Sequence, residues 1–131
     1  LIPNETEFLG LLRQRGEMFC DEKALLQMPV EEFDKHCRKL GPPTILVTLG
    51  DNGVHLSRPD HFERIPAVTG IQAVDTTGAG DAFVGAFAAG LQRFGGDLSK
   101  AAKFANRAAA ISVTRRGTAP AMAHLEEIEA P

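Results

Sequence analysis

The stretch DTTGAGD at residues 75–81, followed by the apolar run FVGAFAAGL at residues 83–91, decides the fold of this chain. Small and apolar residues continue almost unbroken to Leu91, which predicts a helix that is buried on most sides. The first amides of a helix have no intrahelical partner, and the aligned peptide dipoles add positive potential there. The stretch therefore predicts a helix N-terminus whose backbone amides can bind an anion such as a phosphate group.

Asp81 stands at the start of this helix, directly behind Gly78, Ala79 and Gly80. A phosphate oxygen could approach the backbone there, whereas a Leu or Val side chain at position 78 or 80 would obstruct it. The helix dipole favours the ionised form of the neighbouring carboxylate. Such a carboxylate could accept the proton of a hydroxyl that attacks the phosphate, so the stretch favours phosphoryl transfer to an alcohol.

Other interpretations of the motif remain open at this point. An aspartate at a helix start is very often only a cap, worth about 1 kcal/mol. The motif is not a Walker A loop, because the chain has no G-x-x-x-x-G-K-[ST] pattern. A dinucleotide fingerprint would need Gly or Ala at position 83, where Phe83 stands, which argues against a dinucleotide-dependent oxidoreductase.

The rest of the chain alternates between helical and strand patterns, as in an α/β fold. Asn4 and Glu7 suit a capping box for a helix over 8–16, and Pro29 opens a second helix that Gly41 stops. The continuous β-branched run at 44–49 predicts a strand covered by helices on both faces. The remaining expected elements are a turn at 50–53, a half-exposed strand at 54–57, a short strand near 62–65, a long helix capped by Asp97 that ends before Gly117, and a terminal turn after Pro120.

Composition limits the class of protein. The chain has 131 residues, 44% of them hydrophobic and 24% charged, which predicts one globular domain over residues 1–131. A net charge of -3 without a basic run argues against a nucleic-acid partner. The longest apolar stretch is about half what a bilayer requires, and no cleavable signal is visible.

Cys20 and Cys37 belong to no C-x-x-C pair, which favours reduced thiols in a cytoplasmic protein. The four histidines, His36, His55, His61 and His124, are scattered without the spacing of metal ligands, so ordinary surface or core histidines are expected.

Four separated motifs resemble those of the ribokinase-like, PfkB-type carbohydrate kinases. They are NETE at 4–7, VTLGDNG at 47–53, VDTTGAGDAFVGAF at 74–87 and AAAISVTRRGTAP at 108–120, in the order and spacing of that family. The resemblance implies a three-layer α/β fold, with a mostly parallel sheet flanked by helices. It also implies ATP and Mg²⁺ as cofactors and transfer to a primary hydroxyl of a sugar, with ribose as the first candidate. A non-catalytic nucleotide-binding or regulatory module that retains the fold is the alternative.

The resemblance also implies a role for individual residues. By this resemblance, Asp81 occupies the position of the family's catalytic base. The family's anion hole for the γ-phosphate corresponds to Gly78, Ala79 and Gly80. The nucleotide-binding positions implied are Asn4, Glu7, Thr48, Gly50 and Asn106. The ligands implied for a monovalent cation, usually potassium, are Asp75 and the carbonyl groups of Thr77, Ser112, Arg115 and Gly117. Ala121 stands where the family often has a serine, which leaves the dependence on potassium open.

The motifs cover nearly the whole chain but only the C-terminal half of such a kinase. The chain begins LIPNETE without an initiator Met, so it is expected to be a piece of a longer protein. By the resemblance, the missing N-terminal half holds the sugar and carries a small lid, so these residues cannot name the sugar. The chain alone is expected to turn over sugar negligibly, because it cannot hold both substrates together. Exposed strand edges and an open core face are expected to favour a homodimer or pairing with a separate N-terminal half.

Overall fold

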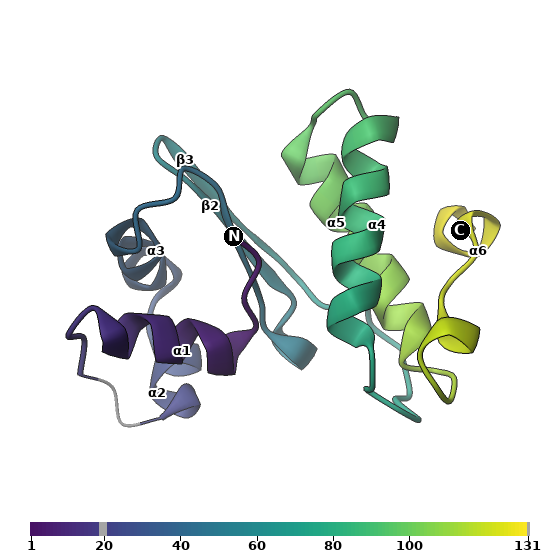
Figure 1. Cartoon of the computed structure of the whole chain (residues 1–131), viewed down its shortest axis with the longest axis horizontal. Helices are drawn as coiled ribbons and strands as arrows, with labels where there is room; N and C mark the ends of the chain where they lie inside the picture. The colour runs from purple at the N-terminus through teal and green to yellow at the C-terminus, as the bar shows by residue number, and fades with distance from the viewer. Residues whose placement is uncertain (19–20, 131) are drawn as a thin grey trace. The chain divides into compact units, whose positions relative to one another are not determined.

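The computed structural model describes residues 1–18 and 21–130, which form two compact units. The first unit, Leu1–Pro66, combines three helices with a sheet, and the second unit, Ala67–Pro131, is helical (Figure 1). The single domain expected over residues 1–131 stays a prediction.

The helices of the first unit begin and end largely where the sequence predicts. Helix α1 (Glu5–Gln14) starts with a capping box, since the Asn4 side chain accepts the Glu7 N–H at 2.8 Å and the Glu7 carboxylate accepts the Asn4 N–H at 2.9 Å. Helix α3 (Val30–Lys39) follows Pro29, as expected. Helix α2 (Glu22–Gln27) was not predicted, because a six-residue segment is too short for a helical period to be recognised.

The sheet of the first unit contains β1 (Ile45–Thr48), β2 (Val54–Arg58) and β3 (His61–Ile65), in that order. Both strand pairs are antiparallel, because the short connections between them allow only hairpins. The segment 1–4 runs parallel to β1, where the Leu46 N–H donates to the Leu1 carbonyl at 2.9 Å and the Thr48 N–H to the Pro3 carbonyl at 3.0 Å. The α/β class is confirmed. Among the described residues, the parallel pairing of this sheet is the one between segment 1–4 and β1.

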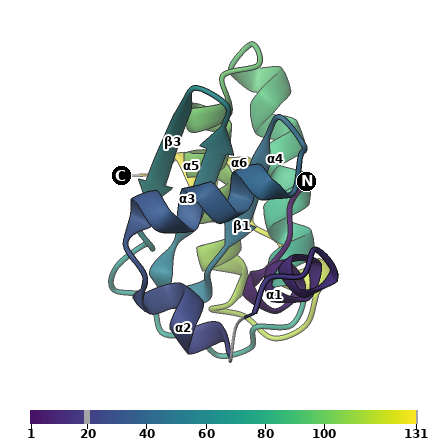
Figure 2. The same ribbon diagram turned by 90° about the vertical axis from the view of Figure 1, so that its left-hand side faces the viewer.

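The core of the first unit lies between the sheet and its helices, and α3 crosses the face of the sheet (Figure 2). On that face Ile45 and Val47 pack against residues that the helices bury. The buried members contributed by α1, α2 and α3 are Phe8, Leu9, Leu12, Leu25, Phe33 and Cys37. The sheet and the helices thus bury one continuous apolar cluster, as the unbroken pattern of β1 implies.

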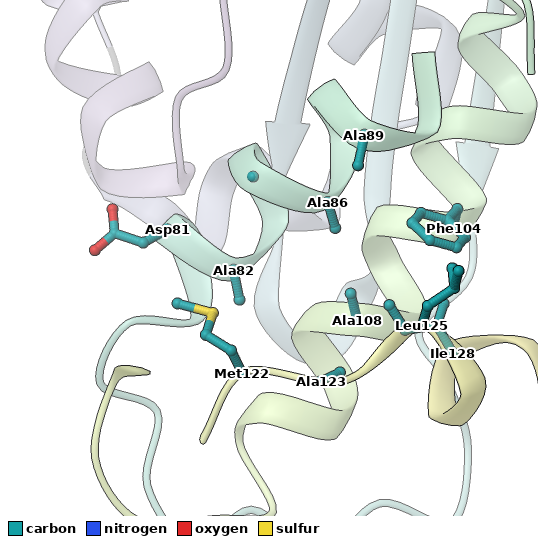
Figure 3. A pocket seen from close by; sticks show the side chains of 11 residues that line it. Asp81, Ala82, Ala86, Ala89, Phe104, Ala108, Met122, Ala123, Leu125 and Ile128 are labelled. Carbon is teal, nitrogen blue, oxygen red and sulfur yellow. The ribbon is translucent and has the colours of Figure 1, made fainter. Parts of the chain in front are cut away.

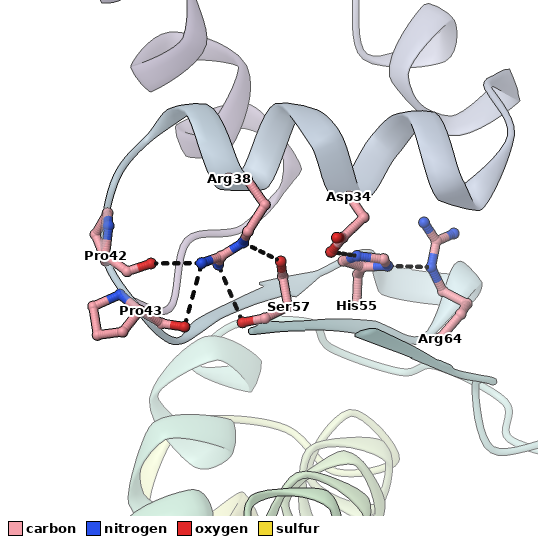
Figure 4. A network of polar contacts seen from close by, with 7 residues as sticks. All are labelled: Asp34, Arg38, Pro42, Pro43, His55, Ser57 and Arg64. Carbon is pink, nitrogen blue, oxygen red and sulfur yellow. Dashed lines mark hydrogen bonds and ion pairs between the residues drawn. The ribbon is translucent and has the colours of Figure 1, made fainter. Parts of the chain in front are cut away.

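Strand β2 corrects one expectation, because it is buried rather than half exposed. His55 and Ser57, on the face toward α3, are fully buried at 0% exposure. Two polar side chains of α3 satisfy them (Figure 4): Asp34 Oδ1 lies 2.9 Å from His55 Nε2, and Arg38 Nε donates to Ser57 Oγ at 2.9 Å. Polar residues at alternate positions of β2 predicted a solvent-exposed face. Instead, His55 and Ser57 form hydrogen bonds with polar side chains of the covering helix α3.

In the second unit, α4 (Ala79–Arg93) and α5 (Leu98–Ser112) lie side by side (Figure 1). Asp97 caps α5 as predicted, with its side chain accepting the Lys100 N–H at 3.0 Å. The two helices approach closely at Gly90, where a Cβ atom would lie 3.0 Å from Ala101 Cα. The short elements η2 (Ala119–Ala121) and α6 (Leu125–Glu129) follow.

Helix α4 is buried along one stripe only, so the expectation of burial on most sides is wrong for this structure. Ala82, Phe83 and Phe87 are buried, whereas Val84 on another face is 47% exposed. The difference arises because the apolar pattern continues around the helix, while α5 packs against only part of its circumference. Among the residues described, no helix is both long and apolar enough to cross a bilayer.

Candidate active site

A tight turn at Gly78 positions the N-terminus of α4. Gly78 has φ +79°, a left-handed conformation that glycine adopts without strain, and a Cβ atom there would lie 3.0 Å from Thr118 Cγ2. The Ala79 N–H donates to the Thr76 carbonyl at 3.2 Å, and the Ala82 N–H donates to the Gly78 carbonyl at 2.9 Å. Both the backbone conformation and the contact with residue 118 therefore require glycine at this position.

The backbone donors behind this turn are open to a ligand. Within residues 1–18 and 21–130, no protein group accepts a hydrogen bond from the amides of Gly78, Gly80 or Asp81. A Cβ atom built on Gly80 would meet no described atom within 4 Å, so the space beside the backbone is free. Ala79, the third residue of the predicted anion hole, differs because its amide already bonds to Thr76. The turn thus offers unpaired donors at the positive end of a helix dipole, a geometry suited to an anion.

Asp81 lies exposed in the first turn of α4, at the rim of a cavity of about 440 Å³. We call this cavity the α4 groove. Its walls are formed by Asp81, Ala82, Gly85, Ala86, Ala89, Phe104, Ala108, Met122, Ala123, Leu125 and Ile128. The Asp81 carboxylate points away from the other labelled residues (Figure 3), so the groove itself is apolar. The carboxylate is therefore free to contact a group outside the groove.

Asp75 joins the loop before α4 to the loop after α5. Its Oδ1 accepts the Thr77 N–H at 2.9 Å, and its Oδ2 accepts the Gly117 N–H at 3.0 Å. The Thr77 side chain, together with these two amides, lowers the pKa of Asp75 to about 2. The carboxylate is therefore ionised at neutral pH, and the structure brings together three of the five residues implied as cation ligands.

The other two implied cation ligands lie at the end of α5. The Ser112 carbonyl accepts the Arg115 N–H at 3.3 Å, and the Ser112 hydroxyl donates to the Ala109 carbonyl at 2.7 Å. The Arg115 guanidinium donates to the Glu127 carboxylate. A carboxylate and backbone carbonyl oxygens are the kinds of donor that suit a hard cation. Ala121 is buried and brings no hydroxyl group.

Four of the predicted nucleotide-binding residues lie together in the first unit, where β1 ends and α1 begins. Asn4 forms a parallel bridge with Thr48. Gly50 lies beside the first turn of α1, since a Cβ atom there would be 3.8 Å from a Glu5 carboxylate oxygen. The capping box uses one carboxylate oxygen of Glu7 and the side-chain oxygen of Asn4. The fifth residue, Asn106, lies half buried on α5 in the second unit.

Sequence reasoning missed a buried polar cluster formed by Asp34, Cys37 and His55, whose potential ligand atoms all lie within 4.8 Å of one another. His55 Nδ1 accepts the Arg64 Nε–H at 3.3 Å, and Nε2 faces Asp34, so protein groups contact both ring nitrogens. Burial is the main cause that lowers the pKa of His55 and raises the pKa of Cys37 to about 12. The cluster lies in the core of the first unit, where Asp34 and Arg64 contact the His55 ring. The predicted free thiol is confirmed for Cys37, and Cys20 lies outside the described residues.

Comparison with known proteins gives the class to which this fold and site belong. Residues 1–124 match the family model of the pfkB family carbohydrate kinases. The match covers more than half of the chain and includes all four motifs that carry the predicted site. The chain therefore belongs to the pfkB family of carbohydrate kinases.

The individual relatives similar to this chain include ribokinases and a deoxyribokinase. The chain is 30% identical over 128 residues to the ribokinase of Staphylococcus aureus, covering 98% of this chain and 39% of that protein. It is 35% identical over 133 residues to the deoxyribokinase of Salmonella typhi, covering 96% of this chain and 38% of that protein. Among solved structures, the ribokinase of Thermotoga maritima matches with a TM-score of 0.80 and 37% identity, over 98% of this chain and 40% of that one. The chain thus spans about two fifths of the length of the relatives that it matches.

Proposed function

We propose that this chain supplies the nucleotide site, the anion hole and the catalytic base of an ATP-dependent kinase that phosphorylates a primary hydroxyl group of a sugar. The observation that carries the proposal is the row of unpaired amides at Gly78, Gly80 and Asp81, with the Asp81 carboxylate exposed beside them. A further support is the Arabidopsis thaliana ribokinase solved with ribose and ATP, which is 32% identical and matches with a TM-score of 0.73.

The proposed reaction assigns a role to each group at the N-terminus of α4. The γ-phosphate lies against the amides of Gly80 and Asp81, where the helix dipole stabilises its charge. The sugar hydroxyl gives its proton to the Asp81 carboxylate as its oxygen bonds to the γ-phosphorus. The bond from this phosphorus to the β–γ bridging oxygen breaks, and ADP leaves. Ala79 contributes the turn that places these donors, while its own amide holds Thr76.

The remaining predicted site residues fit the groups that the reaction requires. Asn4 and Glu7 would hold the nucleotide's magnesium ion, which supplies neutralising charge for the phosphates. Thr48, Gly50 and Asn106 would contact the rest of the nucleotide. Potassium, or another monovalent cation, would bind Asp75, Thr77, Ser112, Arg115 and Gly117, and their contacts would keep the loop before α4 in place.

Ribose is the first candidate for the acceptor sugar, because ribokinases recur among the relatives. Deoxyribose and fructose are the competing acceptors, since a deoxyribokinase and a fructokinase are also similar to this chain. A coupled assay that offers the three sugars separately distinguishes them. The sugar with the highest kcat/KM identifies the substrate.

The test of the catalytic role is Asp81→Asn in this chain co-expressed with a separately encoded N-terminal segment of the Thermotoga maritima ribokinase. We expect kcat for sugar phosphorylation to fall by about 10² to 10⁴-fold, because the base is lost while the shape is kept. Calorimetric titration should show that the variant still binds ATP with Mg²⁺ and that NAD does not bind. Turnover that is unchanged by the substitution, or absent in a wild-type pair that binds ATP, would contradict catalysis by this site and favour a non-catalytic nucleotide-binding module.

A further inference from the structure

The segment between α5 and η2, residues 113–118, contacts the loop before α4 through its backbone. We call it the α5–η2 segment, and it consists of turns and bends. The Val113 carbonyl accepts the Val74 N–H at 2.7 Å and the Asp75 N–H at 3.1 Å. The Gly117 N–H donates to Asp75 Oδ2 at 3.0 Å. Irregular backbone keeps one conformation only where contacts hold it, so the order of the loop before α4 depends on what holds the α5–η2 segment.

Arg115, in the middle of the α5–η2 segment, contacts α6 through its guanidinium group. Nη2 donates to the Glu127 carboxylate, and Nη1 lies 3.5 Å from the Met122 carbonyl oxygen. The second oxygen of Glu127, Oε2, accepts the His124 N–H at 2.7 Å, where α6 begins. The hydrogen bond from Arg115 lowers the pKa of Glu127, so the carboxylate is ionised at neutral pH. One ionised carboxylate therefore joins the start of α6 to the α5–η2 segment.

Helix α6 is itself attached to the two long helices of the second unit. Ile128 is buried in a cluster that includes Phe104 of α5. Glu129 forms an ion pair with Arg93 in the last turn of α4. Because these contacts are made by other residues of α6, the helix provides an anchor against which Arg115 is held.

We infer that Glu127 is a positioning residue for the proposed phosphate turn at the start of α4. Its effect passes to Arg115, along the backbone to Gly117, and through Asp75 to Thr77, the residue before the turn. Phosphoryl transfer depends on the alignment of the reacting groups, so a residue that holds the turn affects the site without touching the phosphate. The inference rests on the proposed function, because that proposal places the γ-phosphate at this turn.

The test compares two substitutions in the first turn of α6. Glu127→Gln removes the charge that faces Arg115 and keeps an acceptor for the start of the helix. Glu126→Gln is the matched control, because it removes the same charge from an exposed position of the same turn. Hydrogen exchange, followed by NMR, is measured at the paired amides 74, 75 and 77. We expect these amides to exchange about two- to tenfold faster in Glu127→Gln and at the wild-type rate in the control.

A second variant and a second measurement separate positioning of the turn from support of α6 alone. Arg115→Met removes the other partner and leaves the hydrogen bond between Glu127 and His124 in place. We expect it to accelerate exchange at the same three amides, and the double variant to add little, because both substitutions remove one interaction. Calorimetric titration with ATP and Mg²⁺ should show a dissociation constant that is about two- to tenfold higher in each single variant and unchanged in the Glu126→Gln control.

The outcomes distinguish this inference from the proposed function. Faster exchange at amides 74, 75 and 77 in both variants, with weaker ATP binding and a silent control, supports the inference. Acceleration that is confined to α6, or that is equal throughout the chain, overturns it. Faster exchange in the loop with unchanged ATP affinity also overturns it. A wild-type chain that binds no ATP contradicts the proposed function, while the exchange rates still decide whether Glu127 positions the loop before α4.

Discussion

At the scale of single residues, Gly78 and Gly80 serve the same turn under different constraints. Gly78 has a positive φ and contacts Thr118, whereas Gly80 is helical with free space around it. We predict that Gly78→Ala lowers the free energy of unfolding by about 1–2 kcal/mol, because an L side chain is strained in the left-handed region. Gly80→Ala should leave this energy unchanged or raise it by up to about 1 kcal/mol, because alanine favours the helix. Urea titrations of both variants measure the difference, and equal effects would contradict the turn geometry.

Asp75 leads to a prediction about pH. Its pKa is lowered to about 2 in the folded state, from 3.8, so the folded protein binds the proton less readily than the unfolded chain. The stabilisation it contributes is complete above pH 3.8 and disappears as the pH falls toward 2. We predict that Asp75→Asn flattens the dependence of the free energy of unfolding on pH within that window. Urea titrations between pH 5 and pH 2 provide the measurement, and parallel pH profiles for the two proteins would contradict the role of the carboxylate.

Residue-scale features were predictable from the sequence when they depend on near neighbours. The capping box of Asn4 and Glu7 involves positions three apart, and its confirmation follows from local chemistry. The contact of Gly78 with Thr118 was not predictable, because only folding brings segments that are forty positions apart together. The link between Asp75 and Gly117 is of the same kind, and both residues were named through the family resemblance alone.

At the scale of elements, the pair α4 and α5 depends on the absence of a side chain at Gly90. A Cβ atom there would lie 3.0 Å from Ala101 Cα, a contact that the backbone of α5 must move to relieve. We predict that Gly90→Leu lowers the free energy of unfolding by about 1–3 kcal/mol through overpacking. Gly85→Leu on the same helix is the control and should leave it unchanged or raise it, because its side chain enters the α4 groove. Thermal unfolding followed by circular dichroism compares the two, and similar losses for both variants would contradict close packing at Gly90.

The elements themselves were largely predictable, whereas their environments were not. Periodicity and caps placed α1, α3, β1, α4 and α5, because those signals lie within each segment. The same pattern failed for the burial of His55 on β2, since an alternating pattern does not show whether a covering helix is polar. It also failed for Val84 on α4, because a sequence shows that a face is apolar but not which segment covers it.

At the scale of the whole molecule, this chain is expected to bind nucleotide without phosphorylating sugar efficiently. A phosphoryl transfer depends on holding donor and acceptor in one geometry, and this chain spans about two fifths of its relatives. We predict that the isolated chain binds ATP with Mg²⁺ in a calorimeter but turns over ribose at least about 100-fold more slowly than when paired with the N-terminal segment. A spectrophotometric assay coupled to ADP release measures both states. Equal turnover by the chain alone would contradict the division of roles between the two segments.

The overall fold class was predictable because four short motifs occur in a fixed order along nearly the whole chain. The match of residues 1–124 to the family model and the similarity to solved ribokinases confirm that class. The sequence left a helix cap and a phosphate site as alternatives for Asp81. In the structure the N-cap of α4 is Gly78 and, among the described residues, no side chain caps the helix, while the roles of Asp81 and the residues around it stay predictions. The identity of the sugar was not predictable, since no motif in these residues is specific for one acceptor.

The two acceptor atoms of Asp75 have a consequence for how this protein tolerates shortening. One carboxylate holds both Thr77, in the loop before α4, and the backbone of Gly117, so we expect the two loops to become ordered or disordered together. Deleting the tail from Gly117 onward would leave Asp81 and the amides of the predicted anion hole in the chain, but it would remove Thr118, which lies beside Gly78. We therefore expect changes in the C-terminal tail to alter the loop before α4, because Gly117 and Thr118 connect the two segments.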